Sequence, residues 1–556
     1  MQGTSQPAVD VPIVAAYGGR RFDVRLAVAL WSVIAAGLVF MARGLPARAF
    51  FAGDPGVKLI AARNAIEHPS RPLDIDLLTV AGQQVGLMDP FFRVHGNHAH
   101  ATTSELFPLI SAPLIAAFGI RGAYVLPAIG FLLTLGAIAV LGVALDNRRS
   151  LAALVFVAAA CTPLLFYALE FWEHAVAVGV AAAGTVLFVS HRSLVSTFVS
   201  GALLGIAMLL RPEGAWYGAA LFICAGWMPK RPNAYVVVAA IAGLSAMCVP
   251  FGVVSAIQSG QLLGAHVTSN LPGMTTDWLT ERTAVFRTWF VPPNVLWFGS
   301  AVLLVIAAVG TKDKPTLTRV VAAAGLAFAV IVTVAAARRT FDAASVWNAE
   351  PALLLPWVLF IGRRSGRTFL LAVALLSSLL VVLTAPNDGG AQWSPRYLLF
   401  ASIPLSILAA DTIDDARRIF GVTGTVAVVV LLVACLLVQR NAYKSLQAAK
   451  RTYERIVQFV ERETPVGSYI VTDLWWLDQV TAALYPTRVM LFVDDAGSVR
   501  QASELLATVP KVFIARSTEE SPPDALQDWQ EGTPFSVRRR ASIEERSLTL
   551  VELNRR

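Results

Sequence analysis

The chain has 556 residues, is 56% hydrophobic and only 15% charged, and has a mean hydropathy of +0.62. Soluble domains carry about 25% charged residues, so the composition excludes a string of soluble domains and predicts a surface that largely faces lipid. The formal net charge of +8 does not indicate nucleic-acid binding, because Lys and Arg stand in short clusters between apolar runs. The four cysteines lie inside apolar stretches without a CxxC pair, which indicates neither a disulfide framework nor a zinc site.

The N-terminal part predicts a tail, a membrane anchor and a long loop. Residues 1–25 are polar and contain an arginine cluster, which is typical of a cytoplasmic tail, and the apolar run 26–42 is predicted to be a retained anchor. Residues 43–121 are too polar to lie wholly in lipid. We predict that they form the first outer loop, and that their apolar part, 106–120, is an interfacial helix.

Twelve further apolar runs predict membrane spans, and two of them, 350–362 and 397–410, are short for the roughly 20 residues that cross hydrocarbon. The runs are 122–145, 151–169, 175–190, 194–210, 214–229, 233–257, 291–310, 320–337, 350–362, 368–385, 397–410 and 419–438. With 106–120 outside the bilayer, the short cytoplasmic loops hold 13 Lys and Arg residues and the opposite loops hold 6. We therefore predict an all-α polytopic protein with about 13 transmembrane helices and a cytoplasmic N-terminus.

The tail, residues 440–556, has a different pattern. Strand-like runs at 467–473, 488–495 and 511–517 alternate with helix-like segments, which predicts a small, mostly parallel α/β domain. No glycine-rich phosphate loop follows these strands, so nucleotide binding has no support. The charge count places this domain on the outer face.

The first outer loop holds the first candidate chemical group. In GDPGVK, Asp54 and Pro55 have the pattern of a helix N-cap and first helical residue, and Lys58 follows four positions after the acid, close enough to pair with it. The apolar residues that follow fall on one stripe, which predicts an amphipathic helix lying on the membrane. Asp54 is then an acid at the lipid–water boundary; the alternative is a plain helix cap.

A histidine group lies further along the same loop. His95, His98 and His100 are flanked by Asp89 and Glu105. Imidazole and carboxylate groups are metal ligands, but the spacing matches no metal motif. A polar loop over a substrate cleft is the interpretation we prefer, and a divalent metal remains the alternative.

The next outer turn, YALEFWEHA, carries Glu170, Glu173 and His174 between two apolar runs. Ionisable groups at the membrane boundary are costly and commonly functional. Residues 170 and 174 share a helical face, so we expect both to support a site. The alternative is an aromatic interfacial belt that carries a few polar groups.

Two arginines stand at later outer boundaries. In MLLRPEG, Arg211 and Glu213 interrupt apolar sequence at a proline, and a cation at a helix break is suited to an anion. Arg396 follows a Gly-Gly pair at the start of a span, and the planar guanidinium suits phosphate. The alternatives are an ion pair at a turn and an interface anchor. One outer acid and two outer arginines together suit an anionic lipid headgroup.

At these residues the chain resembles the GT-C superfamily of membrane glycosyltransferases, which includes protein mannosyltransferases, lipid A aminoarabinose transferases and actinobacterial arabinofuranosyltransferases. The resemblance covers about residues 20–440 and is carried by GDPGVK, FWEH, LLRPEG and GGAQWSPRYLL. It implies a polyprenyl-phosphate-linked sugar donor and an acidic catalytic base in the first outer loop, a position that Asp54 matches. Several GT-C branches have paired acids there and this chain has one, so the subfamily and any metal requirement stay open.

The resemblance implies that Asp54 deprotonates an acceptor hydroxyl while Arg211, Arg396 and Lys58 bind the donor phosphate. Glu170, His174, Glu213, His98 and Glu105 are the expected supporting residues. The acceptor is a glycan, a lipid or a protein, and the expected location is a bacterial inner membrane. The rival functions are a secondary transporter or lipid flippase, although the chain shows no internal repeat, and a non-catalytic scaffold.

Overall fold

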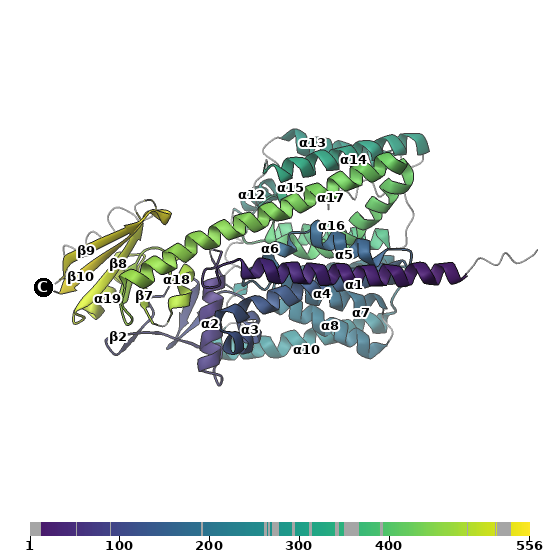
Figure 1. Cartoon of the computed structure of the whole chain (residues 1–556). Helices are drawn as coiled ribbons and strands as arrows, with labels where there is room; N and C mark the ends of the chain where they lie inside the picture. The colour runs from purple at the N-terminus through teal and green to yellow at the C-terminus, as the bar shows by residue number, and fades with distance from the viewer. Residues whose placement is uncertain are drawn as a thin grey trace, which may run out of the picture.

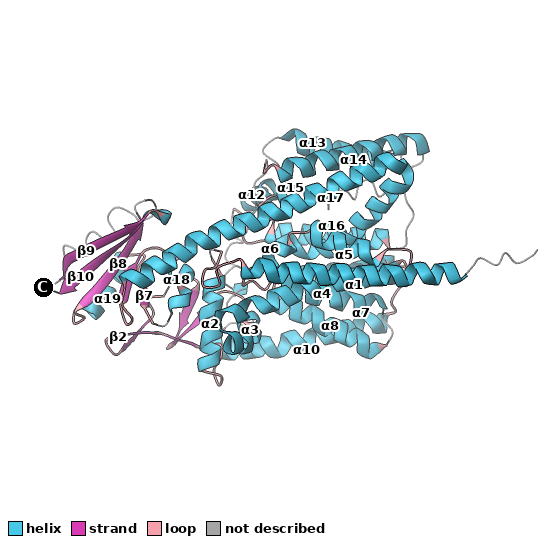
Figure 2. Ribbon diagram, viewed as in Figure 1, coloured by secondary structure: helices cyan, strands magenta, loops and turns pink. Residues whose placement is uncertain are grey.

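The structure is a computed structural model, and it describes residues 13–555 apart from a set of short gaps. The gaps are residues 52, 89, 191–192, 261–263, 265–266, 269–276, 292–294, 311–313, 340–343, 350–365, 390–392, 486, 518 and 520–534. The predicted span 350–362 lies outside the described residues. The described chain forms a helical bundle, a crossing layer of short helices and strands, and a sheet domain at one end (Figures 1 and 2).

Most of the helices belong to the bundle. In chain order they are α1 (Ile13–Arg43), α4 (Val125–Leu145), α5 (Leu151–Ala160), α6 (Leu164–Ala168), α7 (His174–Ser190), α8 (Leu194–Leu210), α9 (Glu213–Ile223), α10 (Ala234–Ser259), α12 (Trp278–Phe290), α13 (Val295–Gly310), α14 (Pro315–Ala337), α15 (Val346–Ala349), α16 (Arg367–Thr384) and α17 (Ser402–Glu463), with short 3-10 turns η2 (Cys224–Trp227) and η5 (Arg396–Ala401).

The outer surface of the bundle is apolar, as expected for helices that face lipid. Among the described residues, six helical stretches are long and apolar enough to cross a membrane, and three shorter apolar helices accompany them. Large apolar side chains on α1 are exposed, such as Val33 at 68% and Phe40 at 80%. Exposed apolar side chains along a whole helix are stable only against hydrocarbon. The chain is therefore a multi-pass membrane protein, and the predicted run 151–169 is divided into α5 and α6.

Close helix pairs in the bundle meet at glycine. A Cβ atom on Gly179 of α7 would lie 2.4 Å from the carbonyl oxygen of Gly130 on α4. A Cβ atom on Gly201 of α8 would lie 1.7 Å from the carbonyl oxygen of Ala240 on α10. In lipid, helices associate through close backbone packing at small residues. These glycines therefore fix how tightly α4, α7, α8 and α10 pack.

Helix α17 connects the bundle to the sheet domain. It covers 62 residues, and it has a kink at Gly421, whose φ of 55° and ψ of −125° are not helical. The predicted run 397–410 precedes this residue, and the run 419–438 begins two residues before it. Beyond residue 438 the helix continues without interruption to Glu463, leaves the bundle and reaches the sheet (Figure 1).

The first loop, residues 44–105, lies at the end of the bundle that faces the sheet domain. Its helix α2 (Pro55–Glu67) runs across the bundle end, beside α3 (Leu106–Phe118) (Figure 1). Its strands are β1 (Ile75–Asp76), β2 (Leu78–Val80), β3 (Gln83–Val85), β4 (Phe92–His95) and β5 (His98–Ala101), arranged as a β1-β5-β4 sheet and a β2-β3 hairpin. After α3, Gly119 (φ 62°) and the turn η1 (Gly119–Tyr124) separate it from α4, so the two are distinct helices.

The prediction of an amphipathic surface helix over α2 is wrong. Ten of its 13 residues are buried, on every side of the helix. The sheet domain packs against α2, whereas an amphipathic helix lying on the membrane would expose one face to water. A Cβ atom on Gly56 would lie 1.9 Å from the carbonyl oxygen of Gln479. Arg63 donates to the carbonyl oxygens of Ala482 and Tyr485. Helix α2 is thus enclosed by protein.

The C-terminal domain is a five-stranded mixed sheet of order β7-β6-β8-β10-β9. Strands β6 (Tyr469–Thr472), β7 (Val489–Phe492) and β8 (Lys511–Ser517) are parallel, as the sequence predicts. Strands β9 (Phe535–Ile543) and β10 (Leu548–Arg555) add an antiparallel edge that the sequence analysis missed. Its helices are α18 (Leu477–Val480) and α19 (Ala496–Leu506), with the turns η6 (Ala482–Leu484) and η7 (Glu545–Ser547).

Candidate active site

Asp54 stands at the start of α2, as expected. Gly53 (φ 95°) turns the chain, and Pro55 begins the helix with a φ that suits its first residue. The Asp54 side chain does not cap the helix. Its Oδ2 atom lies 3.7 Å from Lys58 Nζ and 3.6 Å from Arg396 Nη1. The carboxylate therefore faces two cations instead of the helix end.

Glu173 joins Lys58 to Arg211. Its Oε2 atom lies 2.6 Å from Lys58 Nζ, and its Oε1 atom accepts a bond of 3.1 Å from Arg211 Nη1. The Glu173 and Lys58 side chains are 1% and 0% exposed. At such burial each charge requires a partner, because an unpaired ion inside a protein is very costly. Glu173 thus couples the start of α2 to the end of α8.

Arg211 has a second carboxylate partner. Its Nη2 and Nε atoms donate to the two oxygens of Glu213 at 2.7 and 3.0 Å, a bidentate pair. The Tyr397 ring lies between the two arginines, with the guanidinium carbons of Arg211 and Arg396 at 5.5 and 5.2 Å from its centroid. The structure therefore brings Asp54, Lys58, Arg211, Glu213 and Arg396 together with Glu173 into one group, which we call the acid–arginine cluster.

The chemistry of this cluster follows from how tightly each cation is held. Arg211 bonds closely to two carboxylates. Arg396 and Lys58 contact Asp54 at 3.6 and 3.7 Å, beyond ordinary hydrogen-bond distance. Arg396, whose side chain is 15% exposed, is more open to an incoming anion than Arg211 at 3%, and Lys58, which Glu173 holds at 2.6 Å, adds positive charge beside it. The carboxylate of Asp54 adjoins that anion position, so the cluster can hold a phosphate beside a base.

Glu170 and His174 lie near this cluster but outside it. Glu170 is fully buried and pairs with Lys450 of α17 at 3.0 Å. His174 begins α7, is 2% exposed, and stacks on the Tyr167 ring with centroids 4.9 Å apart. Their contacts are those of packing and orientation.

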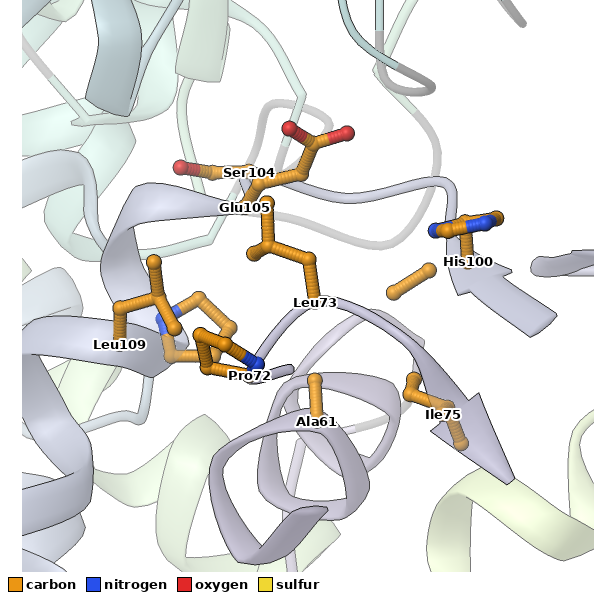
Figure 3. Close-up of a pocket in the computed structure, with 10 residues that line it drawn as sticks. Ala61, Pro72, Leu73, Ile75, His100, Ser104, Glu105 and Leu109 are labelled. Carbon is orange, nitrogen blue, oxygen red and sulfur yellow. The ribbon is translucent and has the colours of Figure 1, made fainter. Parts of the chain in front are cut away.

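His98 begins β5, and Glu105 directly precedes α3. His98 Nδ1 is 3.3 Å from Arg71 Nη1 in the β1-β5-β4 sheet. Glu105 accepts a bond of 3.3 Å from Ser255 of α10 and lines a small hollow together with His100 and Ser104 (Figure 3). The hollow lies between α2, β1, β5 and the start of α3, so these side chains form a second polar area, separate from the acid–arginine cluster.

The histidine group does not assemble as metal ligands in the part of the chain that the structure describes. There, no three His, Cys, Asp or Glu side chains are placed to hold a metal ion. His95 and His98 are paired across the β4–β5 ladder, and His100 Nδ1 is 3.9 Å from Asp74. Asp89 lies outside the described residues. Burial lowers the pKa of His100, which favours its neutral form.

The structure shows three residues in or next to the site to which the sequence analysis assigned no role. Glu173 stood in the FWEH motif without an assigned role, yet it holds the centre of the cluster. Tyr397 follows Arg396 directly, and an aromatic beside an arginine was the available signal. Lys450 lies in a helix with many charged residues, and nothing local distinguishes it from its exposed neighbours.

Comparison with protein-family models and with curated protein sequences finds no match. Comparison with solved structures finds matches. ArnT from Cupriavidus metallidurans in the apo state matches with a TM-score of 0.50 and 12% identity, over 97% of this chain and 98% of that chain. ArnT bound to undecaprenyl phosphate gives a TM-score of 0.51 and 11% identity, over 94% and 97%. The archaeal oligosaccharyltransferase AglB from Archaeoglobus fulgidus gives 0.47 and 14%, over 88% and 69%.

The bundle, the crossing helices and the C-terminal domain together have the fold of ArnT. ArnT matches over nearly the whole length of both chains, so the likeness includes the C-terminal domain.

Proposed function

We propose that this protein is a glycosyltransferase that moves a sugar from a polyprenyl-phosphate donor to an acceptor hydroxyl, with Asp54 as general base. The observation that carries the proposal is the position of the Asp54 carboxylate at the start of α2, 3.7 Å from Lys58 and 3.6 Å from Arg396. The neighbour bound to undecaprenyl phosphate supports the class of donor. The sugar is a hexose or a pentose, and the acceptor is a glycan, a lipid or a protein.

The reaction can be written from the cluster. Asp54 accepts the proton of the acceptor hydroxyl as that oxygen bonds to the anomeric carbon. The bond from this carbon to the phosphate oxygen breaks, and the polyprenyl phosphate leaves with the electron pair. Arg396 and Lys58 neutralise the charge that grows on the phosphate, a stabilisation that is commonly the largest in catalysis. General-base assistance contributes about 10²–10⁴-fold.

Arg211 has a different part in this proposal from the one first expected. Its guanidinium is held by Glu173 and Glu213, and its side chain is 3% exposed. We infer that it stabilises the cluster and adds positive potential, while Arg396 contacts the phosphate itself. Arg396 is the more accessible of the two, with a side chain 15% exposed.

The proposed setting is a bacterial inner membrane, with about 13 spans, a cytoplasmic N-terminus and a C-terminal domain on the outer face. The excess of Lys and Arg in the short loops predicted to be cytoplasmic supports this orientation. The site then opens to the outer leaflet, where a polyprenyl-linked donor enters from the bilayer.

Purified protein in nanodiscs should be tested in two assays. The first measures binding of undecaprenyl phosphate, which should weaken about tenfold in Arg396→Lys, because a point charge does not replace the planar fork. The second offers a panel of polyprenyl-phosphate sugars and measures release of polyprenyl phosphate. In sealed proteoliposomes, movement of the lipid-linked sugar across the membrane without release of polyprenyl phosphate would favour a flippase. Binding of undecaprenyl phosphate without sugar transfer or movement would favour a scaffold.

A further inference from the structure

A second buried ion pair lies beside the acid–arginine cluster and takes no part in the chemistry above. Lys450 Nζ on α17 donates to Glu170 Oε2 at 3.0 Å and to the Tyr124 hydroxyl at 2.9 Å. The Lys450 and Glu170 side chains are both 0% exposed. Lysine and glutamate are almost never fully buried unless paired, and replacing such a pair by apolar residues is often neutral or stabilising. Stability alone therefore does not explain why these two residues are charged.

Glu170 and the Tyr124 hydroxyl also form hydrogen bonds with the backbone of the segment that precedes Asp54. The backbone N–H of Phe51, three positions before Asp54, donates to Glu170 Oε2 at 3.1 Å. The Tyr124 hydroxyl donates to the carbonyl oxygen of Ala47 at 3.0 Å. One network of side chains thus fixes two points in the segment that enters α2.

The two oxygens of Glu170 are both engaged. Oε1 accepts the backbone N–H of Phe171 at 2.9 Å, and Oε2 accepts both Phe51 and Lys450. A carboxylate with this set of donors is not available as a base. Its role is to hold the backbone on both sides, and Lys450 is the side-chain donor that fixes Oε2 in place.

We propose that Glu170 and Lys450 are positioning residues for Asp54, acting through the backbone N–H of Phe51. The inference rests on the proposed function of Asp54. Helix α2 fixes the chain from Pro55 onward, and Glu170 fixes it at Phe51, so the turn between them is anchored at both ends. The Asp54 carboxylate is then kept beside Arg396 and Lys58, where donor phosphate and acceptor hydroxyl meet.

A matched pair of double variants tests this inference. Glu170→Leu with Lys450→Met removes both charges and the acceptor for the Phe51 N–H. Glu170→Gln with Lys450→Met removes both charges but keeps a carbonyl acceptor on the same stem. Hydrogen–deuterium exchange of the peptide that contains residues 50–57 is measured in the full-length protein, together with undecaprenyl phosphate affinity and, with an active donor, kcat and KM.

The Leu/Met protein should keep its Tm within a few degrees while exchange at residues 50–57 rises about tenfold. Its affinity for undecaprenyl phosphate should fall severalfold, and its kcat should fall about tenfold with a smaller change in the acceptor KM. The Gln/Met protein should recover most of each loss. Equal behaviour of the two double variants, or wild-type exchange in the Leu/Met protein, overturns the inference.

Two further proteins keep the test decisive. Tyr124→Phe removes only the bond to Ala47 and one acceptor of Lys450, so it should fold and show a smaller rise in exchange at the same peptide. Lys444→Met, an exposed lysine on the same helix, is the matched control and should change nothing. If the wild-type protein neither binds undecaprenyl phosphate nor transfers sugar, the proposed function fails, while the exchange data still decide whether Glu170 anchors the segment.

Discussion

At the scale of single residues, Asp54 is the position where stability and activity should separate. Asp54→Asn keeps the shape of the side chain, and the lost contacts are long and partly solvated, so the free energy of unfolding should change by about 1 kcal/mol or less. Transfer should fall about 100-fold or more because the base is removed. Undecaprenyl phosphate should bind at least as well, since a negative charge leaves the anion site.

The control for this variant is Glu67→Gln, an exposed acid at the other end of α2. It should transfer sugar at the wild-type rate. An Asn variant that folds and still transfers at the wild-type rate would show that Asp54 only precedes the helix and is not the base.

The two arginines should also give different phenotypes. Arg211→Gln leaves Glu173 and Glu213 buried without their guanidinium, which should cost about 3–5 kcal/mol of folding stability. Arg396→Gln should cost much less stability and instead weaken undecaprenyl phosphate binding at least tenfold. Thermal unfolding and a binding titration on each protein check this. Similar losses of stability in both proteins would contradict the assignment of separate roles.

At the scale of elements, the packing of α18 on the first turn of α2 should be essential. Gly56→Ala places a methyl group 1.9 Å from a backbone oxygen, so the two segments must separate. Overpacking of this kind costs about 1–3 kcal/mol, and it should also lower transfer because Asp54 lies two residues away. Gly37→Ala on α1, where nothing lies within 4 Å, is the control and should leave both the Tm and the activity unchanged.

At the scale of the whole molecule, the orientation in the membrane is open to a labelling experiment. Gln501→Cys lies exposed on α19, and Asn147→Cys lies exposed between α4 and α5. A membrane-impermeant maleimide should label the first in intact cells whose outer envelope admits the reagent, and the second only after lysis. Three native cysteines are buried and one is half-buried, so the unmodified protein gives the background. Reversed labelling would place the site on the cytoplasmic face.

The sequence by itself determined what depends on neighbouring residues. Hydropathy is a local sum, so the membrane character and most helices were predictable. Gly53 and Pro55 are local signals, so the start of α2 and the place of Asp54 were predictable as well. The three parallel strands were visible for the same reason. The charged edge strand β9 was missed because it has few buried residues and no clear apolar alternation.

Only the tertiary structure decided which charges meet. Glu173 and Arg211 are 38 positions apart, and Glu170 and Lys450 are 280 apart, so no sequence window contains either pair. The burial of α2 under the sheet domain likewise comes from a distant part of the chain, and it overturned the prediction of a surface helix. Charge pairing inside a protein is decided by desolvation, because each buried ion must find a partner wherever the fold places one. That requirement pairs Glu170 with Lys450, while Asp54 faces Arg396 and Lys58, the cations that we propose bind the donor phosphate.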